Sequence, residues 1–148
     1  MLIYNFTRYR TDDLRKIFQR GVKENVKRKG LFEKFKRLLI DVRYSKSGIT
    51  GRVARGTAWI LIRLPKKINK KFLPYLAIIF DHELLHVRGY KHNDSIMKKD
   101  LDVEKAKWIS KYKLRKRSGR PSMQKHKLKI KRGHKKRRKR KVIIIDSF

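Results

Sequence analysis

The sequence predicts a small α+β domain, in which a small sheet packs on an N-terminal helix and on a second, buried helix, followed by a basic tail. Three observations predict it. Apolar residues recur with a helical period soon after residue 11, apolar and polar residues alternate in two later segments, and positive charge is concentrated near the C-terminal end. The 148 residues suffice for one domain, which we place at residues 1–110, with the tail at residues 111–148.

The first half of the domain alternates between strand and helix patterns. Residues 2–6 are the first expected strand, and Thr11 or Asp12 can cap a helix that ends at Gly30. Residues 38–44 alternate as a half-buried strand does, and residues 45–51 supply a turn. Residues 57–64 have strand composition, and Pro65 ends that strand.

The second half of the domain is expected to be helical. Residues 71–87 carry apolar side chains on most faces, which is typical of a buried helix, and Pro74 is tolerated because it lies in the first turn. Gly89 ends this helix, and a further helix is expected over residues 94–111. The polar residues inside the apolar helix therefore need an explanation.

Composition excludes several classes of protein. Without cysteine, the chain cannot be a disulfide scaffold, a Cys-ligated zinc protein or a thiol enzyme. No apolar run approaches the roughly 18 residues of a membrane span, and the N-terminus lacks the pattern of a secretory signal. We therefore expect a soluble protein that is cytoplasmic or associated with nucleic acid inside the cell.

Charge indicates a polyanionic partner. The formal net charge is +33, and residues 111–148 hold 18 of the 45 Lys and Arg residues but one of the 12 acids. Residues 111–141 contain no acid, so we expect them to be disordered and to bind nucleic acid through counterion release. A nuclear-localisation-like signal, an anionic membrane surface or simple solubilisation are the alternatives. The apolar end, VIIIDSF, has the composition of a strand that docks on a sheet edge or a partner.

Three histidines and a glutamate stand where the apolar helix ends. His82 and His86 are four residues apart and share one helical face, so both imidazoles can bind one metal ion. Gly89 lets the chain reverse, and His92 can then supply a third nitrogen. Glu83 is offset around the helix and can hold and deprotonate a metal-bound water. This pattern predicts a catalytic Zn²⁺ site with an open coordination position.

Other acids close to the motif leave two questions open. Glu104, on the expected second helix, can replace His92 as third ligand, although the reversal at Gly89 favours His92. Asp81 and Asp94 can each orient a ligand imidazole by accepting its second N–H, or they are ordinary capping and solvated residues.

The segment from His82 to His92 resembles the extended HExxHxxGxxH motif of the metzincin metallopeptidases, and it is similar to the HExxH of the SprT-like and WLM-type proteases. The resemblance implies a minimal zincin-like domain in which His82, His86 and His92 bind zinc and Glu83 is the general base. Metzincins also carry a methionine turn. Met97 follows His92 by five residues, closer than in that family, and we assign it to the core.

A second resemblance points to RNA. Residues 85–92 are similar to part of the HGxLHLxGYDH motif of the YbeY-type endoribonucleases, but Glu83 and Lys91 stand where that family has Gly and Asp.

Three functions follow from these patterns. The leading hypothesis is a zinc-dependent peptidase that acts on nucleic-acid-associated proteins, with residues 57–64 as the edge strand that pairs with substrate and Tyr90 or Arg88 stabilising the oxyanion. The alternatives are a metal-dependent endoribonuclease and a non-catalytic basic protein that binds nucleic acid.

Overall fold

The computed structural model describes residues 1–99 and 101–118 as a small α+β domain, which confirms the predicted fold class. The strands are β1 (Leu2–Asn5), β2 (Leu39–Tyr44), β3 (Thr50–Val53) and β4 (Trp59–Leu64). The α-helices are α1 (Thr11–Lys29), α2 (Leu73–Val87) and α3 (Ser95–Lys99), with short 3-10 helices at Glu33–Arg37, Lys70–Phe72 and Lys107–Lys111. No helix in the described part of the chain is long and apolar enough to cross a membrane.

The sheet has the strand order β1-β2-β4-β3, with β1, β2 and β4 parallel and β3 antiparallel to β4. Two expectations were wrong here. Residues 57–64 were expected to be the edge strand, but β4 pairs on both sides, with β2 and with β3. The edge strand next to β4 is β3, which we had expected to belong in part to a turn. It is short and contains Gly51, so pairing with β4 rather than local propensity makes it a strand.

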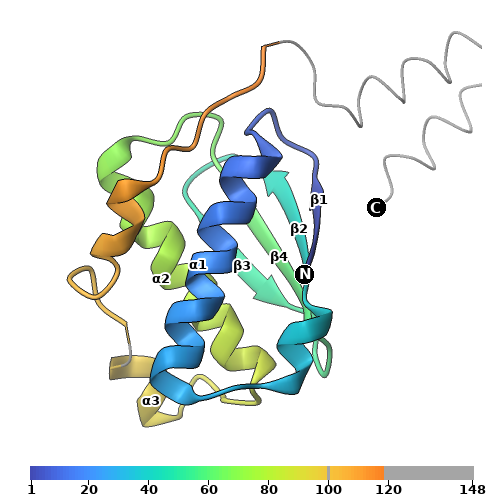
Figure 1. Ribbon diagram of the computed structural model, residues 1–148, viewed down its shortest axis with the longest axis vertical. Helices are drawn as coiled ribbons and strands as arrows, with labels where there is room; N and C mark the ends of the chain where they lie inside the picture. Colours follow the sequence, from blue (N-terminus) through green and yellow to red (C-terminus); the bar gives the residue numbers. More distant parts are fainter. Residues whose placement is uncertain (100, 119–148) are drawn as a thin grey trace, which may run out of the picture.

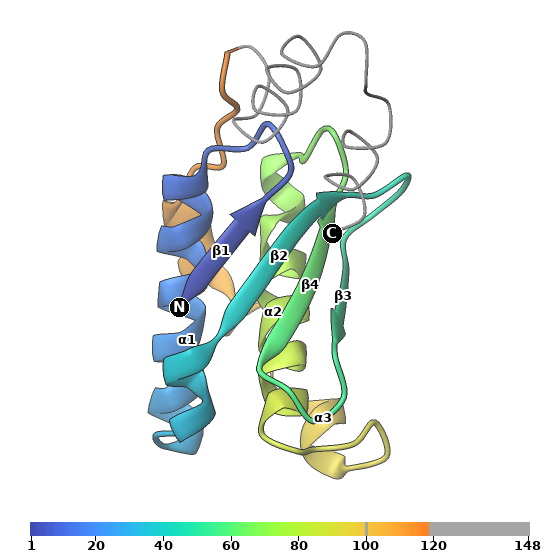
Figure 2. The ribbon, with the colours of Figure 1, turned by 90° about the vertical axis from the view of Figure 1, so that its right-hand side faces the viewer.

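Both long helices lie on one face of the sheet, and the core fills the space between (Figures 1 and 2). Gly21 lies where α1 crosses α2, because a Cβ there would be 2.7 Å from the Phe80 ring. Gly30 ends α1 with a positive φ of 82°, as expected, and its N–H donates to the carbonyl oxygen of Val26. The close α1–α2 contact is made in the middle of α2, before the turns that carry the histidines.

The chain after α2 is less helical than predicted. Instead of one helix over residues 94–111, the structure has α3 and, after a series of turns, the 3-10 helix Lys107–Lys111. The Asp102 carboxylate accepts the N–H of Lys105 at 2.9 Å. Such a side-chain to backbone bond competes with the regular helical pattern, which explains the interruption.

Residues assigned to the tail contact the first turn of α1 and the segment just before it. The N–H of Arg10 donates to the carbonyl of Arg115, and the N–H of Arg117 donates to the carbonyl of Arg8, at 2.8 and 2.7 Å. The Arg115 side chain binds both carboxylate oxygens of the buried Asp13. The folded contacts thus continue past residue 110. The expected disordered segment and the VIIIDSF end fall mainly or wholly in residues 119–148, outside the described residues.

Candidate metal centre

The last two turns of α2 bring the first two histidines together. His82 and His86 lie one turn apart on the same helical face, as their spacing predicts, with ring centroids 4.6 Å apart. Their Nε2 atoms are separated by 3.0 Å. Both side chains are half-buried, so they are held in place while still open to small solutes.

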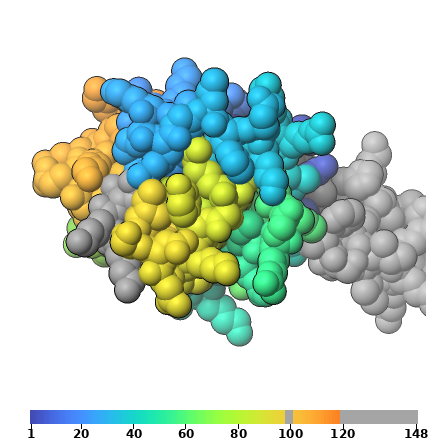
Figure 3. Space-filling model, turned by 90° about the horizontal axis from the view of Figure 1, so that it is seen from below, coloured from blue at the N-terminus to red at the C-terminus, as the bar shows by residue number. Residues whose placement is uncertain are grey.

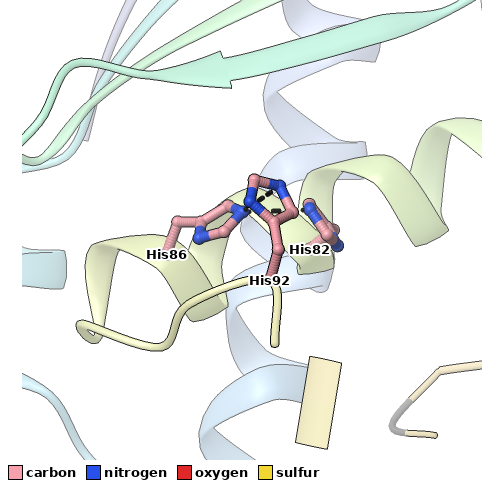
Figure 4. Close-up of side chains that lie close together, drawn as sticks. All are labelled: His82, His86 and His92. Carbon is pink, nitrogen blue, oxygen red and sulfur yellow. Dashed lines mark hydrogen bonds between the residues drawn. The ribbon is translucent and has the colours of Figure 1, made fainter. Parts of the chain in front are cut away.

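The loop after α2 returns the third histidine to the same point. Gly89 has a φ of 102°, a conformation that favours glycine, and the Tyr90 N–H donates back to the carbonyl of Leu85. Asp94 closes the next turn, because its carboxylate accepts the N–H of Lys91 at 2.6 Å. His92 lies within this turn, and its Nε2 is 3.1 Å from Nε2 of His86 (Figure 4).

The three imidazoles suit a divalent cation. Their ligand nitrogens lie within 4.8 Å of one another, and they form the one such cluster of His, Asp or Glu found in residues 1–99 and 101–118. Zinc–nitrogen bonds of about 2.0–2.1 Å at tetrahedral angles place two ligand nitrogens about 3.3 Å apart. The two Nε2 separations at His86, 3.0 and 3.1 Å, are close to that value.

Two of the histidines have an environment that favours the neutral imidazole with a lone pair free for a metal. Nδ1 of His86 lies 2.8 Å from the carbonyl oxygen of Tyr90. Since a carbonyl only accepts, His86 carries a proton on Nδ1, and the lone pair of its neutral form is on Nε2, which faces the other two rings. Burial, followed by the neighbouring His86 and His92, lowers the pKa of His82 and so favours its neutral, ligating form.

Glu83 lies beside the cluster and is buried without a partner. It is 5% exposed, and no hydrogen bond or ion pair reaches its carboxylate within residues 1–99 and 101–118. Burial raises the pKa of Glu83 from 4.5 to about 7. In residues 1–99 and 101–118, the three other buried carboxylates, Asp13, Asp41 and Asp81, each bind an arginine.

Edge strand β3 passes directly over Glu83. A Cβ on Gly51 would lie 2.7 Å from Cγ and 2.9 Å from Oε1 of Glu83, so only glycine leaves room for this carboxylate. Gly51 was not among the residues predicted for the site. A glycine inside a predicted strand can indicate such a close backbone approach. Residues 50–53 were not predicted to be a strand, so this signal could not be used.

A pocket of about 540 Å³ opens next to the histidines and is bordered by β3, the β3–β4 loop and the loop after α2. Glu83, His86 and His92 line it, together with four basic residues, Lys34, Arg52, Arg55 and Lys91. Seen from the end where α2 stops, the segment after α2 (yellow) lies beside α1 (blue) and the β3–β4 loop (green) (Figure 3). The chain thus places a carboxylate and imidazoles at the wall of a basic pocket.

Arg88 lies on the other side of α2, against α1. Its guanidinium donates to Asn25 Oδ1 at 2.8 Å and to the carbonyl of Gly30, and it stacks over the Phe35 ring at 4.9 Å. Asn25, fully buried, also donates to Asp81 at 2.9 Å. These contacts join the C-terminal ends of the two long helices. They give Arg88 a structural position rather than the expected one near an oxyanion, and they orient Asp81 toward Asn25 and Arg28.

The other candidates occupy distinct places. Tyr90 lines the pocket, and its carbonyl orients His86. Asp94 shapes the His92 turn through the backbone of Lys91. Glu104 is exposed, forms an ion pair with Lys107 and is not part of the histidine cluster. Met97 is half-buried in α3.

Comparison of the chain with protein-family models, with curated proteins and with solved structures found no match.

Proposed function

We propose that the chain is a zinc-dependent peptidase in which His82, His86 and His92 hold the metal and Glu83 is the general base. The observation that carries this proposal is the buried carboxylate of Glu83, which has no partner in the described part of the chain although it lies next to three converging imidazoles. A buried unpaired carboxylate costs stability. Its presence beside a potential metal site therefore supports a chemical role.

Zinc bound to three imidazoles would supply a Lewis acid and a water of lowered pKa. Glu83 then accepts the proton of the attacking water and delivers it to the leaving amine. The bond from His86 Nδ1 to the Tyr90 carbonyl holds that ring so that Nε2 faces the site.

An extended peptide has a plausible path across the site along β3. This strand is one of the two edges of the described sheet, and its residues Gly51, Arg52 and Val53 line the same pocket as Glu83 and His92. A peptide that adds to this edge by backbone hydrogen bonds passes over the Glu83 carboxylate. Because pairing through the backbone is tolerant of sequence, specificity depends on the pocket walls.

The net charge of +33 supports substrates that are themselves associated with nucleic acid, and an enzyme that works inside the cell. In this proposal residues 111–141 bind the nucleic acid and concentrate the enzyme near its substrates.

The test compares metal content and casein hydrolysis, with and without chelator. Glu83→Gln is expected to keep its zinc but to lose about 10²–10⁴-fold in turnover, which is the range that general acid–base catalysis supplies. His92→Ala is expected to lose both zinc and turnover. Glu33→Gln is the matched control, because Glu33 is exposed on the 3-10 helix before β2. Wild-type turnover by Glu83→Gln would refute the proposed role.

The basic lining of the pocket favours a second candidate, a metal-dependent endoribonuclease. Glu83 is the one acid among the lining residues, whereas Lys34, Arg55 and Lys91 can bind phosphate. Parallel incubations of the zinc-loaded protein with structured RNA and with casein distinguish the two activities. In either case, chelator must abolish the cleavage that is observed. If the zinc-loaded protein cleaves neither substrate, the third hypothesis, a non-catalytic basic binding protein, is favoured.

A further inference from the structure

The face of the sheet opposite the helices is open in the described part of the chain (Figure 2). Alternation along the strands assigns every second side chain to this face. The register places Leu2, Leu39 and Trp59 in one row across β1, β2 and β4. The next row contains Tyr4, Asp41, Leu61 and Arg52, and the one after it contains Arg43 and Arg63. These nine residues are named the open face below.

The open face exposes rings and aliphatic groups that a folded protein normally buries. Leu2 is 63% exposed, Tyr4 48% and Trp59 47%. Strand spacing of about 4.8 Å places Tyr4 and Trp59 about 10 Å apart across the sheet and about 7 Å apart along it. Both rings can therefore contact the same extended ligand. A contiguous set of this kind marks an interaction site more often than scattered exposed residues do.

Arginines lie in the same row as Tyr4 and in the row beyond it, and they border Trp59. Arg43, Arg52, Arg55 and Arg63 border a groove of about 440 Å³ that Trp59 also lines. The one acid of the groove, Asp41, is 5% exposed and forms an ion pair with Arg43 at 3.2 Å. The open face thus presents net positive charge next to Trp59, on the same surface as Tyr4.

We propose that the open face binds single-stranded nucleic acid, with Trp59 and Tyr4 stacking on bases and the arginines binding phosphates. Rings for unpaired bases and cations for the backbone are the two elements that such surfaces combine. The bases of a duplex are stacked on one another, so a duplex offers these rings no partner. A second copy of this chain, also at +33, would bring repulsive charge to the arginines. This inference does not depend on the metal centre or on the hydrolase proposal.

The test uses the full chain and fluorescence anisotropy with a short labelled oligo(U). Trp59→Ala is expected to weaken binding at least fivefold, because stacking contributes about 1–3 kcal/mol per base. Tyr75→Ala is the matched control, since Tyr75 is 49% exposed but lies on α2. Arg63→Ala is expected to reduce the slope of log K against log salt by about 0.7 for one lost phosphate contact. The control for the charge is Arg15→Ala, on α1.

Binding to duplex DNA separates stacking from general electrostatics. Trp59→Ala is expected to leave the affinity for duplex unchanged. In a Trp108→Phe background, Trp59 is the remaining tryptophan, and its fluorescence is expected to be quenched by oligo(U) but not by duplex. Equal affinity of Trp59→Ala and wild type for oligo(U) would overturn the proposal and assign single-strand binding to other basic residues. If Trp59→Ala weakens binding to an acidic polypeptide such as poly-glutamate as much as it weakens binding to oligo(U), the proposal is overturned in favour of a protein partner.

Discussion

Replacing Gly51 by alanine tests the relation between the edge strand and the site. The added Cβ would be 2.7 Å from Glu83 Cγ and 2.8 Å from Ile79 Cγ2, whereas ordinary contacts begin near 3.4 Å. Either β3 or the Glu83 side chain must therefore move by about 0.7 Å. Overpacking of this kind costs about 1–3 kcal/mol, partly offset by the reduced entropy of the unfolded chain. The expected net loss of about 1–2 kcal/mol lowers the Tm by about 4–8 °C.

The displacement has a larger consequence for chemistry than for stability. A catalytic group moved by about 1 Å can lose about 10²-fold in rate, so we expect kcat/KM of Gly51→Ala to fall at least tenfold with zinc retained. Gly21→Ala is the matched control. Its Cβ would clash equally, at 2.7 Å from Phe80, but at the α1–α2 contact rather than at Glu83. It is expected to lower Tm without lowering kcat/KM. Hydrolysis of peptide by Gly51→Ala at the wild-type rate, or an equal loss of activity in Gly21→Ala, would show that displacement of Glu83 does not control the rate.

Three further predictions concern the metal, pH and the helix junction. His92→Ala is expected to weaken zinc binding by more than about 10–100-fold, the loss typical when a residue that only hydrogen-bonds to a metal ligand is replaced. Glu104→Ala is expected to leave the zinc stoichiometry, measured by elemental analysis, unchanged. Burial raises the pKa of Asp13, but the hydrogen bonds and charge of Arg115 outweigh it and hold the pKa below 3.8. Its stabilising contribution is therefore present above pH 3.8 and lost as pH falls through the lowered value. Thermal unfolding should show Asp13→Asn less stable than wild type at pH 7 and equal to it once Asp13 is protonated in both states. Arg88→Ala should lower Tm because Asn25 and two backbone carbonyls lose their donor. At a temperature where the variant is folded, its kcat/KM should equal that of wild type. A large loss of kcat/KM there would instead support a role of Arg88 at the oxyanion.

Local patterns predicted the parts of the fold that local forces determine. The spacing of apolar residues, with Gly30 as its stop, located α1, and the long apolar run located α2. The histidine cluster followed from helical geometry and from the reversal at Gly89, both of which act within eleven residues. Its convergence is therefore predictable without the rest of the fold.

Features set by distant parts of the chain were not predictable in this way. β3 is a strand because β4 pairs with it, and the composition of its four residues does not favour one. Arg88 contacts Asn25, 63 residues earlier in the sequence, so no local pattern distinguishes it from a residue of the site. The exposure of Trp59 likewise depends on both helices packing on the opposite face of the sheet.

Comparison of the four carboxylates that are buried in the described part of the chain supports a chemical role for Glu83. The chain has 45 Lys and Arg residues for 12 acids, so cations are plentiful, and Asp13, Asp41 and Asp81 each bind an arginine. Glu83 and Asp81 lie two residues apart on the same helix and are 5% and 3% exposed, yet only Asp81 of the two faces a guanidinium. Basic residues line the same pocket as Glu83, but none forms an ion pair with its carboxylate within the described residues. An arginine there would stabilise the fold but would hold the carboxylate ionised and engaged. A carboxylate left without such a partner, beside three imidazoles, is available to a cation and to the proton of a bound water.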